Sequence, residues 1–167
     1  MKAILLATIA AITVQPLVFM LLFLTPLLVM GADISPQEFF GIPLFSALYA
    51  TPFVVVVGIP SLLLLQRFKL LSWLTLTVVG FVAAALPVAV YSWSEYPGFS
   101  SGGNWYGTPV DFVINGQKTY YGWFSYAQSV LFFGLHGLVG ALVFFFVWRR
   151  CLSPNPAFKR DALKRAP

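Results

Sequence analysis

The sequence predicts an all-α membrane protein of four transmembrane helices, with a small extracytoplasmic β-hairpin between the third and the fourth helix. Of the 167 residues, 59% are hydrophobic and only 9% are charged, whereas about a quarter of the residues in a soluble domain carry charge. Four apolar stretches are each long enough to cross about 30 Å of hydrocarbon. Basic and acidic residues also gather in alternate loops, as expected when each stretch crosses the membrane once.

The distribution of charge predicts the orientation. Basic residues gather near Lys2, in the connection at residues 66–69, and in the segment from Arg149 onward. Four of the five acidic residues lie in the other two loops: Asp33, Glu38, Glu95 and Asp111. Lys and Arg are enriched in cytoplasmic loops. We therefore expect both termini in the cytoplasm and the long loop outside.

The first two expected spans cover residues 4–30 and 39–65. A signal peptide has an apolar core of about 7–15 residues, so we interpret the first, longer run as a retained helix. Cleavage near residues 29–32 is the alternative. Both spans contain prolines, which remove backbone donors and predict kinks: Pro16, Pro26, Pro43, Pro52 and Pro60.

The third and fourth expected spans cover residues 70–93 and 126–148. The four spans form a single transmembrane domain over residues 1–148, followed by a basic cytoplasmic tail over 149–167. The fourth span carries small residues that share one helix face: Gly134, Gly137 and Ala141. Small residues allow another helix to approach closely. We expect this face to pack inside the bundle, with dimerisation as the alternative.

The external loop, residues 94–125, contains a strong hairpin signal at Asn115-Gly116. Both central residues of a type I′ turn need positive φ, which Asn and Gly adopt at low cost. The turn predicts four cross-strand pairs: Ile114 with Gln117, Val113 with Lys118, Phe112 with Thr119 and Asp111 with Tyr120. The preceding segment, residues 95–107, is rich in Gly and Ser and is expected to be irregular.

Aromatic residues make the same loop a candidate recognition surface, because Tyr and Trp dominate interaction hot spots. The candidates are Trp105, Tyr106, Tyr120, Tyr121 and Trp123. An aromatic belt that lies on the lipid headgroups and packs on itself is the simpler interpretation. The composition of the loop does not distinguish the two.

The four expected spans contain no Asp, Glu, Lys or Arg. Ion-coupled transporters place an ionisable group within the membrane, so transport driven by carboxylate titration is not expected. Four uncharged polar residues lie at similar depth near mid-span: Gln15, Tyr49, Thr51 and His136. Hydrogen bonds between helices are their simplest role, and a polar site for a ligand or a proton relay is the alternative.

The sequence lacks the residue patterns of an enzyme or a metal site. His136 is the only histidine and Cys151 the only cysteine, which excludes a His/Cys metal cluster and an intramolecular disulfide. Neither a nucleophile beside a base nor a Gly-rich phosphate loop is present. We expect no enzymatic activity, no cofactor and no nucleic-acid partner.

The carboxyl-terminal tail, NPAFKRDALKRAP at residues 155–167, resembles the tail that integron gene cassettes encode at their recombination site. The resemblance covers only this tail and implies a bacterial mobile cassette gene without naming an activity. For a chain with four membrane spans it implies the bacterial inner (cytoplasmic) membrane. The rest of the chain resembles no functional family.

Two hypotheses for function follow. In the first, a non-enzymatic membrane protein binds a membrane or envelope partner through its external aromatic loop. In the second, the chain forms a small oligomeric transporter or channel with a path past Gln15, Tyr49 and His136. Both place the chain in a lipid bilayer, and a homo-oligomer is compatible with either.

Overall fold

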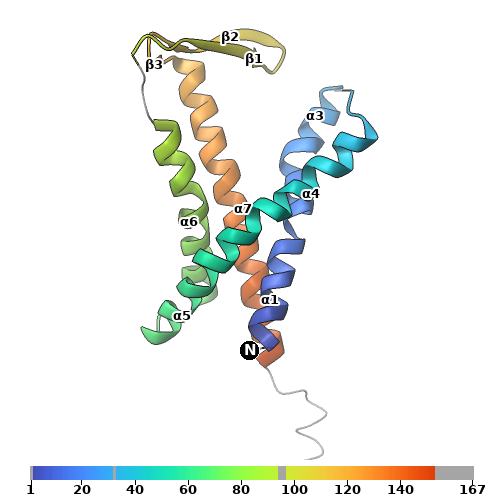
Figure 1. Ribbon diagram of the computed structural model, residues 1–167, viewed down its shortest axis with the longest axis vertical. Coiled ribbons are helices and arrows are strands. Elements are labelled where there is room, and N and C mark those ends of the chain that lie inside the picture. Colours follow the sequence, from blue (N-terminus) through green and yellow to red (C-terminus); the bar gives the residue numbers. More distant parts are fainter. Residues whose placement is uncertain (1, 32, 94–96, 153–167) are drawn as a thin grey trace, which may run out of the picture. The chain divides into compact units, whose positions relative to one another are not determined.

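The computed structural model describes residues 2–31, 33–93 and 97–152, which form helices and one small sheet (Figure 1). The helical segments are α1 (Lys2–Thr13), α2 (Gln15–Phe19), η1 (Met20–Leu24), α3 (Thr25–Val29), α4 (Pro36–Phe53), η2 (Val54–Gly58), α5 (Ile59–Arg67), α6 (Trp73–Trp93) and α7 (Tyr120–Leu152). The strands are β1 (Ser101–Trp105), β2 (Thr108–Ile114) and β3 (Gln117–Lys118). The tail that resembles integron cassette products lies outside the described residues.

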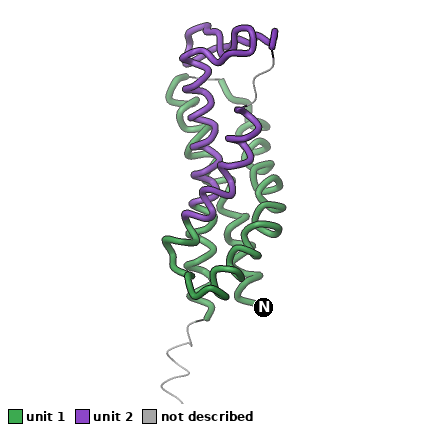
Figure 2. Tube along the Cα trace, turned by 90° about the vertical axis from the view of Figure 1, so that its left-hand side faces the viewer, with its two compact units in different colours: residues 1–77, 139–167 green, residues 78–138 purple. Residues whose placement is uncertain are grey.

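Four helices are long and apolar enough to cross a membrane, which confirms the number predicted. Each forms one continuous helical run in the described chain, and the runs are Lys2–Val29, Pro36–Arg67, Trp73–Trp93 and Tyr120–Leu152. The chain divides into two compact units (Figure 2), one of residues 1–77 with 139–167 and one of residues 78–138.

The first unit has a core built from four helical segments. Its buried members are Ala7, Ala11, Leu62, Leu76, Phe144 and Phe145. The two alanines lie four residues apart on α1, so they share one face of that helix and let neighbouring segments approach its backbone closely. Large side chains from α5, α6 and α7 fill the space that the small residues leave.

The irregularity expected from the prolines takes the form of two π-helical turns, η1 and η2. The Thr25 N–H donates to the Met20 carbonyl, and the Ile59 N–H donates to the Val54 carbonyl, each five residues earlier. Pro26 and Pro60 follow directly. A proline ring clashes with the carbonyl four residues before it, and the wider π turn moves that carbonyl away.

The second unit contains a three-stranded antiparallel sheet in the order β1-β2-β3. The predicted pairs of Ile114 with Gln117 and Val113 with Lys118 are present, and both turn residues have positive φ, 52° at Asn115 and 87° at Gly116. The predicted strand pairs of Phe112 with Thr119 and Asp111 with Tyr120 were wrong, because strand β3 ends at Lys118 and helix α7 begins at Tyr120. Residues 95–107 were expected to be irregular. This prediction was wrong for Ser101–Trp105, which forms the edge strand β1. Pairing with β2 provides the order that its Gly-rich composition does not.

Helix α7 begins at Tyr120, six residues before the predicted start of the fourth span. Thr119 precedes it and caps the first turn, since its hydroxyl accepts from the Gly122 N–H at 3.1 Å. Such a cap satisfies a donor that has no partner within the helix. The loop is therefore shorter than predicted, and three of the five aromatic candidates lie on the first turn of α7.

Candidate recognition surface

The sheet rests directly on the first turn of α7 (Figure 1). The Thr119 N–H donates to the Phe112 carbonyl at 3.0 Å. A β-carbon built on Gly122 would collide with the same carbonyl oxygen of Phe112. Only glycine therefore allows strand β2 to lie this close to the helix, and the sheet and α7 form one platform.

Lys118 ties strand β3 to the end of α6. Its ammonium group donates to the Trp93 carbonyl at 3.0 Å, where the negative end of the helix dipole favours a cation. The same nitrogen lies 5.4 Å from the ring centre of Trp123 and 5.8 Å from that of Tyr126. Both distances suit a cation–π interaction, so Lys118 is an anchor of the sheet.

The turn between β1 and β2 is fixed to α7 as well. Tyr106 and Gly107 occupy its two central positions with φ values of 49° and 91°. The Asn104 side chain accepts from the Gly107 N–H at 2.6 Å, and Gln128 donates to the Tyr106 hydroxyl at 2.8 Å. Sequence reasoning missed this turn because Tyr-Gly is a weaker signal for a type I′ turn than Asn-Gly.

The structure separates the predicted aromatic candidates into two groups. Trp105 is half-buried, and its ring contacts those of Phe112 and Tyr121 with centres 6.1 and 6.4 Å apart. The other four candidates are exposed, and Tyr120 is the most exposed at 72%. The five candidates did not include Phe124, another aromatic residue of the predicted loop, whose ring centre lies 4.7 Å from that of Tyr120. The i, i+4 spacing of these two residues on a helix was the available signal.

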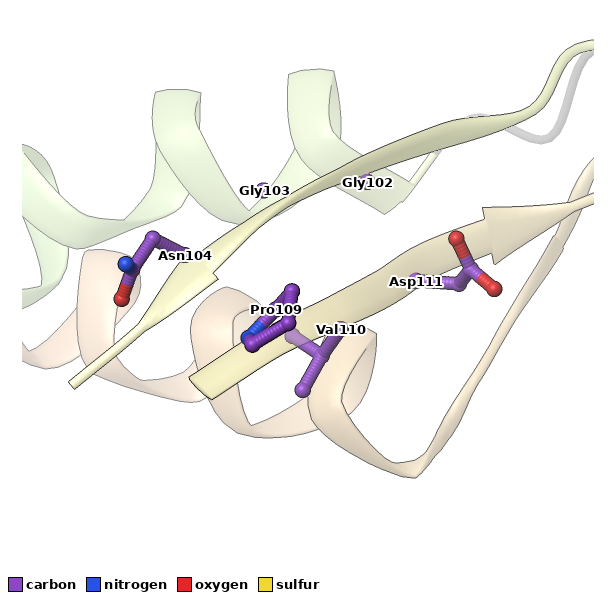
Figure 3. Close-up of a pocket in the computed structure, with 6 residues that line it drawn as sticks. All are labelled: Gly102, Gly103, Asn104, Pro109, Val110 and Asp111. Carbon is purple, nitrogen blue, oxygen red and sulfur yellow. The ribbon is translucent and has the colours of Figure 1, made fainter. Parts of the chain in front are cut away.

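A shallow open hollow runs along strands β1 and β2 (Figure 3). It is lined by Gly102, Gly103, Asn104, Pro109, Val110 and Asp111. Asn104 and Asp111 lie at its two ends. Asn104 is already used by the turn, and the hollow is open to the surroundings, so we assign it no ligand.

The mid-span polar candidates of the first unit do not share an enclosed site. Gln15 is only 3% exposed, and its amide donates to the Ala11 carbonyl at 3.0 Å. Thr51 donates to the Ala47 carbonyl at 2.8 Å. Tyr49 is 73% exposed. His136 belongs to the second unit, where its ring centre lies 4.7 Å from that of Phe132.

The small residues predicted to allow close helix packing lie against neighbouring groups within their own units. A β-carbon on Gly134 would collide with the Phe81 ring, and one on Gly137 would lie 2.6 Å from the Ala84 β-carbon. Ala141 packs against the core of the first unit. The geometry around Gly134 and Gly137 therefore corresponds to close packing of α7 on α6.

Within residues 2–31, 33–93 and 97–152, no group of three or more His, Cys, Asp or Glu side chains could hold a metal ion. Cys151 is a free, exposed thiol. No known protein family, curated protein or solved structure matches this chain. The candidate surface is accordingly defined by its geometry alone, as the exposed aromatic side chains of Tyr106, Tyr120, Tyr121, Trp123 and Phe124 on the platform of sheet and helix.

Proposed function

We propose that the chain is a non-enzymatic integral membrane protein that binds a membrane or envelope partner through this aromatic surface. The four long apolar helices support membrane insertion. Basic residues at Lys2, Arg67 and Arg149 support cytoplasmic termini, and the tail that resembles integron cassette products supports a bacterial inner membrane. The sheet then faces the outside, where an envelope component can reach it.

The observation that carries this proposal is an exposed aromatic pair on a fixed support. Tyr120 and Phe124 are 72% and 49% exposed, yet the turn that bears them is tied to strand β2 through Thr119 and Gly122. Side chains that are already held in place lose little entropy on binding, which favours affinity. Aromatic groups presented in this way are typical of binding hot spots.

Photo-crosslinking in intact cells tests the proposal. With benzoylphenylalanine at Tyr120, we expect a discrete protein or glycan adduct that disappears when Phe124→Ala is added. The matched control carries the same probe at Leu131, which is also exposed on α7 but lies about three turns deeper along the helix. Adducts with lipid alone at position 120 would contradict the proposal and support an aromatic belt.

Cysteine labelling tests the proposed orientation separately. Three exposed glutamines provide matched sites in a Cys151→Ser background: Gln37, Gln66 and Gln117. We expect an impermeant maleimide added to intact cells to label Gln37→Cys and Gln117→Cys but not Gln66→Cys. Labelling of Gln66→Cys alone would reverse the orientation and place the sheet in the cytoplasm.

A further inference from the structure

The helical run of α4 and η2 carries a polar group in the middle of an exposed apolar stripe. The members of the stripe follow helical spacing, and all are exposed: Phe45, Tyr49, Pro52 and Val56. The run Pro36–Arg67 has 32 residues, so Tyr49 lies about 20 Å from its start at about 1.5 Å per residue. If about 30 Å of hydrocarbon covers the middle of the run, the Tyr49 hydroxyl lies inside it.

The Tyr49 hydroxyl differs from the two other hydroxyls nearby on α4. Ser46 donates to the Pro43 carbonyl at 2.6 Å and Thr51 to the Ala47 carbonyl at 2.8 Å, so both are satisfied by their own helix. The longer, rigid Tyr49 side chain is 73% exposed, and no described residue of the first unit accepts from its hydroxyl. Lipid tails offer no acceptor, and an unpaired hydroxyl in hydrocarbon costs free energy.

A suitable acceptor lies on the neighbouring residue of the same helix. Pro52 has no N–H, so it cannot donate to the carbonyl of Leu48 four residues earlier. Leu48 is exposed, as is Pro52. Helix α4 therefore presents a hydrogen-bond donor without an acceptor and a carbonyl deprived of its helical donor, one residue apart.

We propose that two copies of this chain associate through α4, with the Tyr49 hydroxyl of each copy donating to the Leu48 carbonyl of the other. In a two-fold symmetric interface the same patch meets itself, so one donor and one acceptor satisfy each other twice. Copies inserted in the same direction are related by an axis along the membrane normal. Equivalent residues then lie at equal depth. Tyr49 of one copy and Leu48 of the other, one residue apart in the sequence, can therefore meet, whereas a donor and an acceptor far apart along the helix could not.

The charge of the stripe also suits a second copy. The sequence between Glu38 and Arg67 contains no charged residue, so two such helices meet without like-charge repulsion. The polar hydroxyl proton and the carbonyl oxygen provide the electrostatic complementarity. This inference rests on the proposed insertion of α4 in the membrane and is independent of partner binding by the sheet.

Energy transfer between chains labelled with donor or acceptor dye on the native Cys151 tests the inference, using full-length protein in dodecylmaltoside micelles over a range of protein-to-detergent ratios. We expect a saturable dimer. Two hydrogen bonds of average strength for membrane helices correspond to about eightfold in the dissociation constant, and Tyr49→Phe should weaken the dimer by this factor. Pro52→Ala restores the helical donor to Leu48 and should weaken the dimer while making the monomer more resistant to unfolding.

Tyr91→Phe is the matched control, because Tyr91 is also a highly exposed tyrosine on an apolar helix, and it should leave the dimer unchanged. The double variant Tyr49→Phe/Pro52→Ala should be no weaker than Tyr49→Phe, since both changes remove the same bond. A chain that stays monomeric at all ratios would overturn the inference, as would a dimer insensitive to Tyr49→Phe. A monomer that Tyr49→Phe destabilises would also overturn it, by placing the acceptor within the same chain.

Discussion

The side-chain nitrogen of Gln15 lies 2.8 Å from the position that a β-carbon on Gly140 would occupy. Gln15 is buried and also donates to the Ala11 carbonyl. The absent side chain at Gly140 therefore provides the space for a polar group in an otherwise apolar core. A buried amide that keeps its hydrogen bonds adds specificity to packing, whereas a displaced one costs the desolvation of its polar atoms.

Gly140→Ala should consequently destabilise the first unit. The added methyl group overlaps the Gln15 amide, and overpacking of this kind costs about 1–3 kcal/mol. Unfolding by sodium dodecyl sulfate in mixed micelles measures the loss. Gly41→Ala is the control, because open space surrounds that helical glycine and alanine is the better helix former. Gln15→Ala in combination with Gly140→Ala should recover part of the stability, and no recovery would mean that the overlap is not the cause.

The turn at Asn115 gives a second prediction, which depends on backbone conformation alone. Its φ of 52° is favourable for Gly and tolerable for Asn, but a β-branched residue there costs about 1–2 kcal/mol. Asn115→Val should loosen the hairpin and make it sensitive to protease, while Asn115→Gly should not. Equal protease resistance of the two variants would show that the turn does not hold the sheet together.

The sequence was sufficient to predict the features that depend on local chemistry. Four helices follow from the lengths of the apolar runs, and the register around Asn115 follows from the turn that these residues favour. The start of α7 was also predictable in principle, because Thr119 is a good helix cap. It was missed because the aromatic residues after Thr119 were interpreted as part of a loop.

Features that depend on distant contacts could not be predicted in this way. Strand β1 has two glycines at its centre and becomes ordered only by pairing with β2. The role of Lys118 depends on Trp93, 25 residues earlier, and nothing in the local sequence indicates that contact. Likewise, the sequence predicts similar depths for Gln15 and Tyr49, but the burial of one and the exposure of the other depend on tertiary packing.

Gly122 gives a third prediction, which concerns the contact between sheet and helix. A methyl group at this position overlaps the Phe112 carbonyl, and a backbone carbonyl that accepts from the Thr119 N–H cannot move aside as a flexible side chain can. Gly122→Ala should cost about 3 kcal/mol and release the sheet from α7. Hydrogen exchange of the Thr119 amide reports this release. Ser125→Ala, three residues along the same helix, should leave the exchange unchanged, and slow exchange in Gly122→Ala would contradict the contact.

Lys118 gives a fourth prediction, which separates its charge from its length. Lys118→Met keeps most of the apolar stem but removes the donor to the Trp93 carbonyl and the cation beside Trp123 and Tyr126. Because the site is only partly buried, the loss should be about 1–2 kcal/mol, with faster quenching of tryptophan fluorescence by iodide. Lys118→Arg keeps the charge and the donors, so it should behave like the native chain. If Met and Arg have equal effects, the packing of the stem, and not the ammonium group, holds strand β3 to the end of α6.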